Sequence, residues 1–545
     1  MRISSLLAAL VVATLPTLIA PALAQTTSSL YDAARNAGAS ATDAAGLALA
    51  ATQEAQLLAT NGAMDDFFGV SVSLSGERAL VGAYLGDSVS GVQNAGAAYV
   101  FERQTNGVWI QTAQLAATGG VGGDFFGISV SLSGDRALVG ASRAAVGAAV
   151  RAGSAYVFDR QANGAWTQTA QLLASGGTQN DEFGYSVSLS GARALVGAPE
   201  DAAGGVTNPG SADVFEQQAD GTWRQTAHLT AADGATGDFF GQSVALSGER
   251  ALVASYFDTV GAARAAGSVY VFERQGGGAW SQTAQLAATD GAGGDYFGFS
   301  LSLSGERALV GAAGDDVGAA VNAGSAYVFE RQISGAWVLT AQLVATDGAV
   351  GDQFGFSVSL SGTRALVGAQ ADNTVSGGTD AGSAYVYERQ AGGTWVQTDQ
   401  IVAAGGAASD YFGYSVSLSG ERALVGAYFT DTLAGYEVGS AYVFALAPLG
   451  TAVAEDGTEA SFTLSAPRPN PAAYRASLEV TLDRPQHVRA TLIDALGRTV
   501  AVLHDGEAAG ILALGMDTRA LAPGVYVVRV VAGGRVASAR LVVAR

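Results

Sequence analysis

Apolar and small polar residues alternate along short stretches of this chain, and the same alternation returns many times. Residues 186–190, S-V-S-L-S, follow the two-residue period of a half-buried β-strand. A tight S-G turn and the apolar segment R-A-L-V-G-A come next. After a longer loop, the segments G-S-A-Y-V-F-E-R and W-x-Q-T-A-Q-L, as most copies spell them, supply two more strand patterns. The pattern predicts a unit of four antiparallel strands.

The unit repeats at a nearly fixed period, which the Phe-Gly pair makes easy to follow. Successive pairs are 57 or 58 residues apart, and there are seven of them: residues 68–69, 126–127, 183–184, 240–241, 297–298, 354–355 and 412–413. Four short strands in a period of this length are typical of a β-propeller blade. The sequence therefore predicts seven blades.

The two ends of the array indicate that the blades close into a ring. The seventh copy stops after 439–446 and lacks its W-x-Q-T-A-Q-L strand, whereas residues 50–60, AATQEAQLLAT, resemble that strand as it occurs at 165–175. We therefore predict that an N-terminal strand completes the last blade. A closed ring leaves no sheet edge unpaired, whereas a linear solenoid would need polar capping repeats.

The predicted fold class is all-β: a seven-bladed β-propeller of four-stranded antiparallel blades closed by an N-terminal strand, followed by a small immunoglobulin-like β-sandwich. The propeller is expected to span residues 50–446. Its repeats begin near residues 66, 124, 181, 238, 295, 352 and 410.

The repeated motif resembles a known family. D-x-F-G-x-S-V, followed by a strand that ends V-G-A-P (complete at Val196–Pro199), is similar to the FG-GAP repeat, and the resemblance covers residues 53–446. That repeat builds the seven-bladed propeller of integrin alpha subunits and of many bacterial surface proteins. The resemblance implies the fold and leaves the activity open, because one fold hosts many activities.

The N-terminus has the pattern of an export signal. Arg2, the apolar stretch from Leu6 to Ile19 and the small residues Ala22-Leu23-Ala24 predict a signal peptide over 1–24 that is cleaved near Ala24, in preference to a membrane anchor. Residues 25–49 form a leader that is either a short helix or a loose segment. No other segment is long and apolar enough to span a bilayer, so we expect no transmembrane span in the mature protein.

The C-terminal part changes character after a linker at 447–465. In residues 466–545, β-branched and polar residues alternate between turn signals, as in a small β-sandwich. Pro469-Asn470-Pro471, Leu496-Gly497-Arg498, Pro523-Gly524-Val525-Tyr526 and the terminal basic strand resemble the C-terminal sorting domain of type IX secretion. The resemblance implies a partner in the type IX secretion machinery and a protein that is secreted or held on the outer surface of a Gram-negative cell. The alternative is an accessory sandwich without a sorting role.

Composition narrows the possible chemistry. The chain has no cysteine and three histidines, which excludes disulfides and thiolate metal sites and leaves little for a zinc site. The net charge is −20, and residues 466–545 carry ten arginines against six acids, so the rest of the chain carries −20 − 4 = −24. An acidic body repels phosphate backbones, so nucleic acid is not an expected partner.

Acidic residues gather in two sets of loops that antiparallel alternation places on one face. The loop before the first strand ends in aspartate in every copy: Asp66, Asp124, Asp181, Asp238, Asp295, Asp352 and Asp410. The loop between the second and third strands adds Asp87, Asp201, Asp258, Asp315, Asp316, Asp372 and Asp431, whereas the second copy carries Arg143 and Arg151 instead. We predict that this second set forms part of a partner-binding face, because binding residues favour loops on a rigid scaffold.

Calcium is one hypothesis for these acids, and no cofactor is firmly predicted. The integrin repeats bind calcium through D-x-[DN]-x-D-G-x-x-D between the first two strands, where this chain has only a short S-G turn. The weaker candidate is D-G-x-x-G-D, at Asp233 with Asp238, Asp290 with Asp295, and Asp347 with Asp352. Two carboxylates alone cannot supply the six to eight oxygens that are typical of calcium. The alternative is that the second aspartate of each pair accepts backbone N–H groups in a turn.

No catalytic residues are predicted. The serines of S-V-S-L-S have no repeated histidine to activate them, His228 is expected on the surface of an outer strand, and the recurrent Glu-Arg after Y-V-F is expected to be a solvated strand end. The sequence predicts a non-enzymatic binding or adhesion protein for an extracellular polysaccharide or a matrix or surface protein. The alternatives are a secreted carbohydrate-active hydrolase that uses the acidic face, and a purely structural module of the surface layer.

Overall fold

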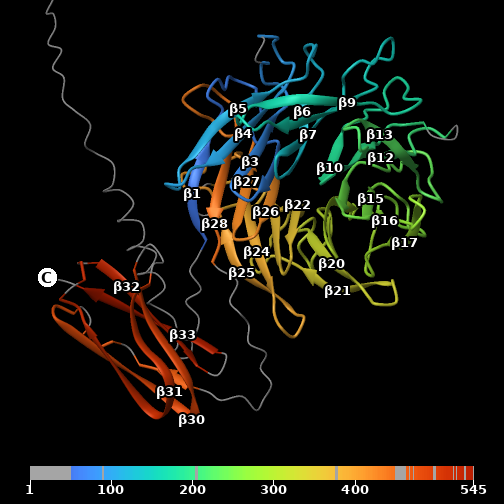
Figure 1. Cartoon of the computed structure of the whole chain (residues 1–545). Coiled ribbons are helices and arrows are strands. Elements are labelled where there is room, and N and C mark those ends of the chain that lie inside the picture. The colour runs from blue at the N-terminus through green and yellow to red at the C-terminus, as the bar shows by residue number, and fades with distance from the viewer. Residues whose placement is uncertain are drawn as a thin grey trace, which may run out of the picture. The chain divides into compact units, whose positions relative to one another are not determined.

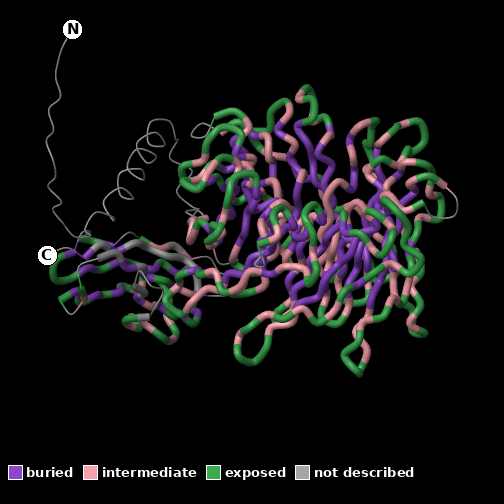
Figure 2. The backbone as a smooth tube through the Cα atoms, turned by 90° about the horizontal axis from the view of Figure 1, so that it is seen from above, coloured by how far each residue is buried: buried purple, intermediate pink, exposed green. Residues whose placement is uncertain are grey.

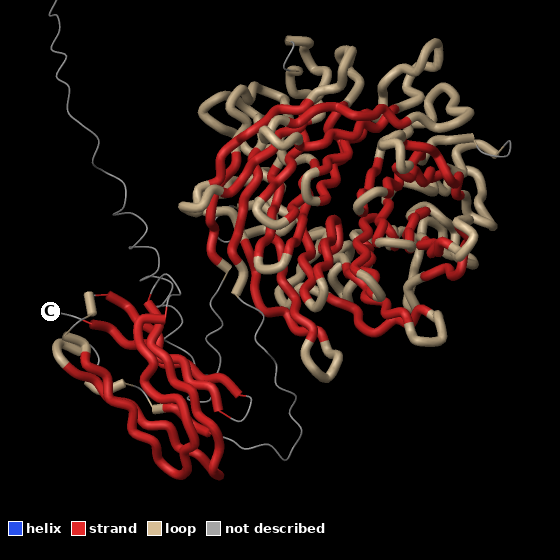
Figure 3. The backbone as a smooth tube through the Cα atoms, viewed as in Figure 1, coloured by secondary structure: helices blue, strands red, loops and turns tan. Residues whose placement is uncertain are grey.

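A computed structural model describes residues 51–88, 91–202, 206–374 and 378–447, and in the C-terminal part 462–465, 467–469, 472–494, 499–519, 521–522, 524–532 and 535–543. All regular elements of these residues are β-strands, as Figure 3 shows. Among the described residues there is no helix long and apolar enough to cross a membrane. The predicted signal peptide at 1–24, the leader at 25–49 and most of the linker at 447–465 lie outside the described residues.

Seven four-stranded antiparallel sheets follow one another along the chain, and we number them as blades (Figure 1). Blade 1 contains β2 (Ser71–Ser75), β3 (Arg78–Ala83), β4 (Ala97–Arg103) and β5 (Trp109–Leu115). Blade 2 contains β6 (Phe126–Ser133), β7 (Arg136–Ala141), β8 (Ser154–Arg160) and β9 (Trp166–Leu172). Blade 3 contains β10 (Ser186–Ser190), β11 (Arg193–Ala198), β12 (Ser211–Gln217) and β13 (Trp223–Leu229).

The remaining blades have the same order of strands. Blade 4 contains β14 (Val244–Ser247), β15 (Arg250–Ser255), β16 (Ser268–Arg274) and β17 (Trp280–Leu286). Blade 5 contains β18 (Phe297–Ser304), β19 (Arg307–Ala312), β20 (Ser325–Arg331) and β21 (Trp337–Leu343). Blade 6 contains β22 (Phe354–Ser361), β23 (Arg364–Ala369), β24 (Ser383–Arg389) and β25 (Trp395–Ile401). Blade 7 contains β26 (Ser415–Ser419), β27 (Arg422–Ala427), β28 (Ser440–Ala445) and, from the N-terminus, β1 (Thr52–Leu57).

The N-terminal strand closes the ring, as predicted. β1 pairs antiparallel with β28 in a register that runs from Thr52 opposite Ala445 to Leu57 opposite Ala441. The first strand of each blade contacts the first strand of the next, and β26 of blade 7 contacts β2 of blade 1. The predicted seven-bladed all-β propeller is therefore confirmed.

Packing between blades explains the apolar and small residues of the inner strands. β3 and its equivalents are buried along nearly their whole length, whereas the outermost strands alternate between exposed and half-buried positions (Figure 2). The serines of S-V-S-L-S link neighbouring blades: Ser73 Oγ accepts a hydrogen bond from Leu132 N at 2.9 Å, and Ser417 Oγ accepts one from Leu74 N at 2.9 Å across the closure. Their role is structural, since each satisfies a backbone N–H of the next blade.

The Phe-Gly pair fills and tightens the gap between blades. Phe68 is fully buried and belongs to a core shared by blades 7 and 1. Gly127 has φ +93°, and its carbonyl oxygen lies 2.0 Å from where a Cβ on Gly82 would stand. Only glycine permits this close approach of two backbones.

The C-terminal part folds around a separate apolar core. β29 (Phe462–Leu464), β30 (Arg475–Asp494), β31 (Thr499–Asp517), β32 (Gly524–Ala532) and β33 (Arg535–Val543) form one antiparallel sheet in which β30 pairs with β29, β31 and β32. Alternate residues of β30, such as Leu478 and Val480, are buried in its core. The immunoglobulin-like sandwich stays a prediction for this part.

Candidate functional site

Two sets of loops lie together on one face of the propeller, as the alternation of strands predicted. The loop between the second and third strands of one blade hydrogen-bonds to the Phe-Gly segment of the next blade. Phe126 N donates to Ala95 O at 3.3 Å, and across the closure Phe68 N donates to Val438 O at 2.9 Å. We call this side of the propeller the Phe-Gly face.

The seven aspartates predicted for partner binding all lie on the Phe-Gly face, but most are engaged internally. Asp316 and Asp431 are exposed, whereas Asp315 and Asp372 are buried. Tyr327 Oη donates to Asp315 at 2.9 Å. The other contacts within this set are Ser211 to Asp201, Tyr270 to Asp258, Tyr385 to Asp372, and backbone N–H groups to Asp87, Asp316 and Asp431. Their role in partner binding stays a prediction.

The six candidate calcium ligands are also occupied by protein donors. In each D-G-x-x-G-D the second aspartate accepts a backbone N–H three residues earlier, at 2.6 Å: Ala235 to Asp238, Ala292 to Asp295 and Ala349 to Asp352. The first aspartates accept side-chain donors: Gln285 to Asp233, Tyr327 to Asp290 and Tyr385 to Asp347. Over the described residues there is no group of three or more His, Cys, Asp or Glu side chains that could hold a metal ion. Calcium stays a hypothesis, and the turn-capping alternative matches the observed hydrogen bonds.

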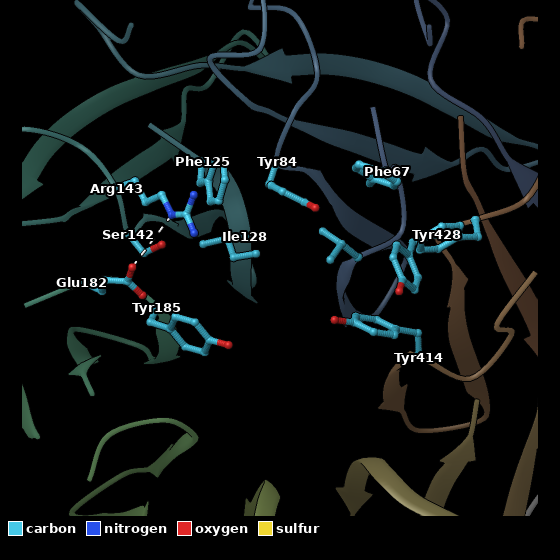
Figure 4. A pocket seen from close by; sticks show the side chains of 12 residues that line it. Phe67, Tyr84, Phe125, Ile128, Ser142, Arg143, Glu182, Tyr185, Tyr414 and Tyr428 are labelled. Carbon is cyan, nitrogen blue, oxygen red and sulfur yellow. Dashed lines mark ion pairs between the residues drawn. The ribbon is translucent and has the colours of Figure 1, made fainter. Parts of the chain in front are cut away.

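The Phe-Gly face also has a pocket of about 300 Å³ that is lined largely by aromatic rings. The sequence patterns did not predict it. Four consecutive blades contribute to it, from blade 7 across the closure to blade 3 (Figure 4). Its lining consists of Phe67, Val70, Tyr84, Phe125, Ile128, Ser142, Arg143, Glu182, Tyr185, Tyr414, Tyr428 and Phe429. We call it the aromatic pocket.

The pocket residues come from the variable positions beside the invariant motif residues. The residue between Asp and Phe-Gly has positive φ in all seven copies, including Phe67 at 57°, Phe125 at 60° and Glu182 at 54°. Such a backbone costs about 1–2 kcal/mol for residues other than glycine, yet no copy has glycine here. The aromatic character of these positions was visible in the sequence, and it was the signal that could have identified the site.

One side of the aromatic pocket is charged. Arg143 Nε lies 3.8 Å from Glu182 Oε1, and Arg151 forms a much closer ion pair with the same carboxylate oxygen. The guanidinium carbon of Arg143 lies 4.1 Å from the centroid of the Phe125 ring, a cation–π contact. Figure 4 shows Arg143, Phe125 and Glu182 together on this side, opposite Tyr414 and Tyr428.

The phenols of the pocket are protonated near neutral pH. Burial raises the pKa values of Tyr84, Tyr185, Tyr414 and Tyr428 above their ordinary value. These hydroxyl groups can therefore donate hydrogen bonds to a ligand, and they are poor general bases.

The expectation that the recurrent Glu-Arg is a solvated strand end was wrong. Glu102 accepts from Arg78 of its own blade at 3.2 Å and from Arg160 of the next blade at 2.9 Å. The side chain of Glu102 is only 18% exposed, so these pairs are half-buried. Four further junctions between blades repeat the interblade pair, at Arg103–Glu54, Arg274–Glu216, Arg331–Glu273 and Arg389–Glu330.

Glu54 fits this series although it comes from the closing strand. Blade 7 has Ala445 where other blades have the acidic residue, so β28 cannot supply it. Glu54 Oε2 instead accepts from Arg422 Nε at 3.0 Å and from Trp109 Nε1 at 3.3 Å, and lies 3.5 Å from Arg103 Nε. β1 therefore supplies the carboxylate that blade 7 lacks.

His228 has a buried partner that the sequence reasoning did not foresee. Its Nδ1 lies 2.8 Å from Asp213 Oδ1, and Asp213 stands where the other six blades have tyrosine. The hydrogen bond to Asp213 raises the pKa of His228, and desolvation raises the pKa of Asp213. The Ser211 hydroxyl donates its proton to Asp201. It therefore does not donate to His228, as a serine nucleophile activated by a histidine base would.

Comparison with known proteins identifies both parts of the chain. The FG-GAP repeat model matches seven segments: residues 51–101, 109–158, 166–215, 223–272, 280–329, 337–387 and 395–444. Each segment begins on the outer strand of one blade and ends on the third strand of the next, so the first begins on β1. Residues 469–544 match the secretion system C-terminal sorting domain.

Other comparisons add little. No curated protein matches the chain. A periplasmic gluconolactonase from Pseudomonas aeruginosa, PpgL, is similar in structure at 17% sequence identity, over 62% of this chain and 86% of that chain, with a TM-score of 0.40. A likeness this loose carries no argument about activity. The sorting domain indicates type IX secretion, which makes the protein a secreted or cell-surface protein with a partner in that machinery. The chain belongs to the FG-GAP repeat family.

Proposed function

We propose that this protein is a non-enzymatic binding or adhesion protein of the Gram-negative cell surface, and that the aromatic pocket binds an extracellular polysaccharide. The observation that carries the proposal is the lining of the pocket, where seven aromatic side chains and three polar or charged groups converge from four blades. Ligand sites are characteristically concave and largely apolar, with a few placed polar groups.

The chemistry of the lining suits sugars. A pyranose ring has apolar C–H faces that pack on aromatic rings, and its hydroxyl groups need donors and acceptors at the edge. Phe67 and Tyr84 stack on each other at 5.4 Å between centroids with an interplanar angle of 12°, which holds these two rings of the lining parallel. The protonated tyrosine hydroxyls supply the donors.

The same lining supports binding over hydrolysis. Most glycoside hydrolases need two carboxyl groups about 5–10 Å apart, and Glu182 is the single carboxylate in the lining. Arg151 forms a close ion pair with this carboxylate, so it is already engaged within the protein. A second carboxyl group at that separation in the lining would have favoured the hydrolase alternative.

The test is binding of the full-length chain to arrays of glycans and matrix proteins, followed by titration calorimetry on the glycans that bind. Tyr84→Ala removes a ring of the pocket and should weaken glycan binding by about fivefold, since an aromatic contact is worth roughly 1 kcal/mol. Tyr256→Ala is the matched control, because Tyr256 occupies the equivalent position of blade 4 outside the pocket.

The outcomes separate the candidate functions. Glycan binding lost in Tyr84→Ala and kept in Tyr256→Ala supports the proposal. Turnover of a bound glycan, detected as new reducing ends, would replace it with the hydrolase alternative. Absence of any ligand on both arrays would favour the structural module.

A further inference from the structure

The acidic pattern of the Phe-Gly face is broken at one blade, and the aromatic pocket opens at the same place. In the loop between their second and third strands, six blades carry aspartate, whereas blade 2 carries Arg143 and Arg151. Arg143 lines the aromatic pocket, and no other lining residue is basic. The proposed function does not explain why the basic residues are there.

Glu182 and Arg151 leave Arg143 available to a ligand. Glu182 has a side chain only 9% exposed, and its closer ion pair is the one with Arg151. The contact of Arg143 with the same oxygen is 3.8 Å, which is too long for a hydrogen bond. Arg151 therefore neutralises the buried carboxylate, and within the described part of the chain the Arg143 guanidinium makes no hydrogen bond.

The position of Arg143 presents those donors to the pocket. Its side chain is 43% exposed, and its guanidinium lies over the Phe125 ring, which holds the group at this edge of the pocket. Phe125 in turn packs edge-on against Tyr84 at 4.9 Å between centroids. The Arg143 guanidinium thus lies at one end of a row of contacting rings, which are Phe125, Tyr84 and Phe67.

We infer that the aromatic pocket selects an acidic sugar, a pyranose residue with an anionic substituent, and that Arg143 is the residue that binds the anion. The sugar ring packs on the rings of Phe67 and Tyr84 while the guanidinium forms a forked, charge-assisted pair with the anionic group. The inference rests on the proposed function, whose site it shares. A uronic acid carboxylate and a sulfate ester both have the chemistry that a guanidinium recognises.

The experiment compares ligands that differ only in charge. Titration calorimetry of the full-length chain would use oligogalacturonate and the same oligomer with its carboxylates methyl-esterified, and a second arm would use dextran sulfate against dextran. We expect wild-type protein to bind an acidic member at least about tenfold more tightly than its neutral counterpart, as a charge-assisted hydrogen bond gives. The arm that shows the preference identifies the anionic group.

Two variants test the role of the arginine. Arg143→Gln should remove the preference for the acidic ligand, so that the acidic and the neutral ligand bind within about twofold of each other. Arg264→Gln is the matched control, because Arg264 is exposed in the corresponding loop of blade 4, outside the pocket. Arg143→Lys, which keeps the charge and loses the fork, should restore part of the preference.

Failure of the inference differs from failure of the proposed function. Equal binding of acidic and neutral ligands by wild-type protein, or equal loss of both in Arg143→Gln, overturns the inference and leaves polysaccharide binding intact. Binding of no glycan, charged or neutral, in these titrations and on the arrays overturns both.

Discussion

The contacts of Glu54 make a sharp prediction about how the ring stays closed. Glu54 lies on β1, which is joined to the rest of blade 7 by hydrogen bonds and side-chain packing and not by a neighbouring stretch of chain. Replacing Glu54 by alanine removes the acceptor for Arg422 and Trp109 and the partner of Arg103. The substitution should release β1 before the rest of the propeller unfolds.

The size of the effect follows from those three contacts. The charge-assisted hydrogen bond from Arg422 is worth about 1.5 kcal/mol and the indole hydrogen bond about 1 kcal/mol. The longer ion pair with Arg103 adds up to about 0.5 kcal/mol, because both side chains are part-exposed. The sum of about 3 kcal/mol corresponds to a rise of roughly 100-fold in the opening equilibrium of β1.

Hydrogen exchange measures this opening directly. Backbone amides of residues 52–57 should lose about 100-fold of their protection in Glu54→Ala, whereas those of β28 should lose less. Glu102→Ala is the matched control, because it breaks a similar pair of contacts with Arg78 and Arg160 in a strand that is continuous with its blade. Equal protection of β1 in the two variants would refute the idea that Glu54 locks the closure.

Three further predictions concern the Phe-Gly face. Phe125→Gly relieves a positive φ of 60° while it removes a pocket ring, so glycan affinity should fall about fivefold with the midpoint of urea unfolding almost unchanged; a large drop in that midpoint would show that the ring is structural. Desolvation raises the pKa of Asp66 and of Asp352 from 3.8 to about 6, so the stability they contribute is full below pH 3.8 and is lost as the pH rises through 6. Unfolding free energy should thus be about 1 kcal/mol per group higher at pH 5 than at pH 7.5, and Asp66→Asn should reduce that difference; an unchanged difference would count against the shift. Chelation with EDTA should leave the melting temperature and glycan binding unchanged, because protein donors occupy the six candidate calcium ligands; a fall in either would revive the calcium hypothesis.

The architecture was predictable from the sequence alone, because seven near-identical copies carry the same local patterns. In each copy the segments S-V-S-L-S, S-G and R-A-L-V-G-A predict two strands and the turn between them. These patterns depend only on residues a few positions apart in the sequence. Even the closure was predictable, since residues 50–60 resemble the strand that the seventh copy lacks. The aspartates of the two loop sets were placed on the correct face for the same reason.

The candidate site was not predictable in this way, because it is built from residues in which the copies differ. Phe67, Tyr84, Arg143, Glu182 and Tyr414 occupy positions at which the copies differ, so the repeated motif does not single them out. The sequence also suggested that Glu-Arg was solvated, because nothing within one repeat shows that the next blade brings an arginine to the same carboxylate.

Which of these variable residues lie in contact depends on the arrangement of the blades in the closed ring. Tyr414 and Tyr428 lie 330 residues or more from Phe67 and Tyr84 along the chain, and they share a pocket only because β1 joins the last blade to the first. Strand formation is a local property that each copy repeats, whereas a pocket needs particular side chains from several blades at fixed distances. Ring closure sets those distances. The strands of a blade can therefore be predicted from one repeat, whereas the pocket forms only when all seven repeats have closed into a ring.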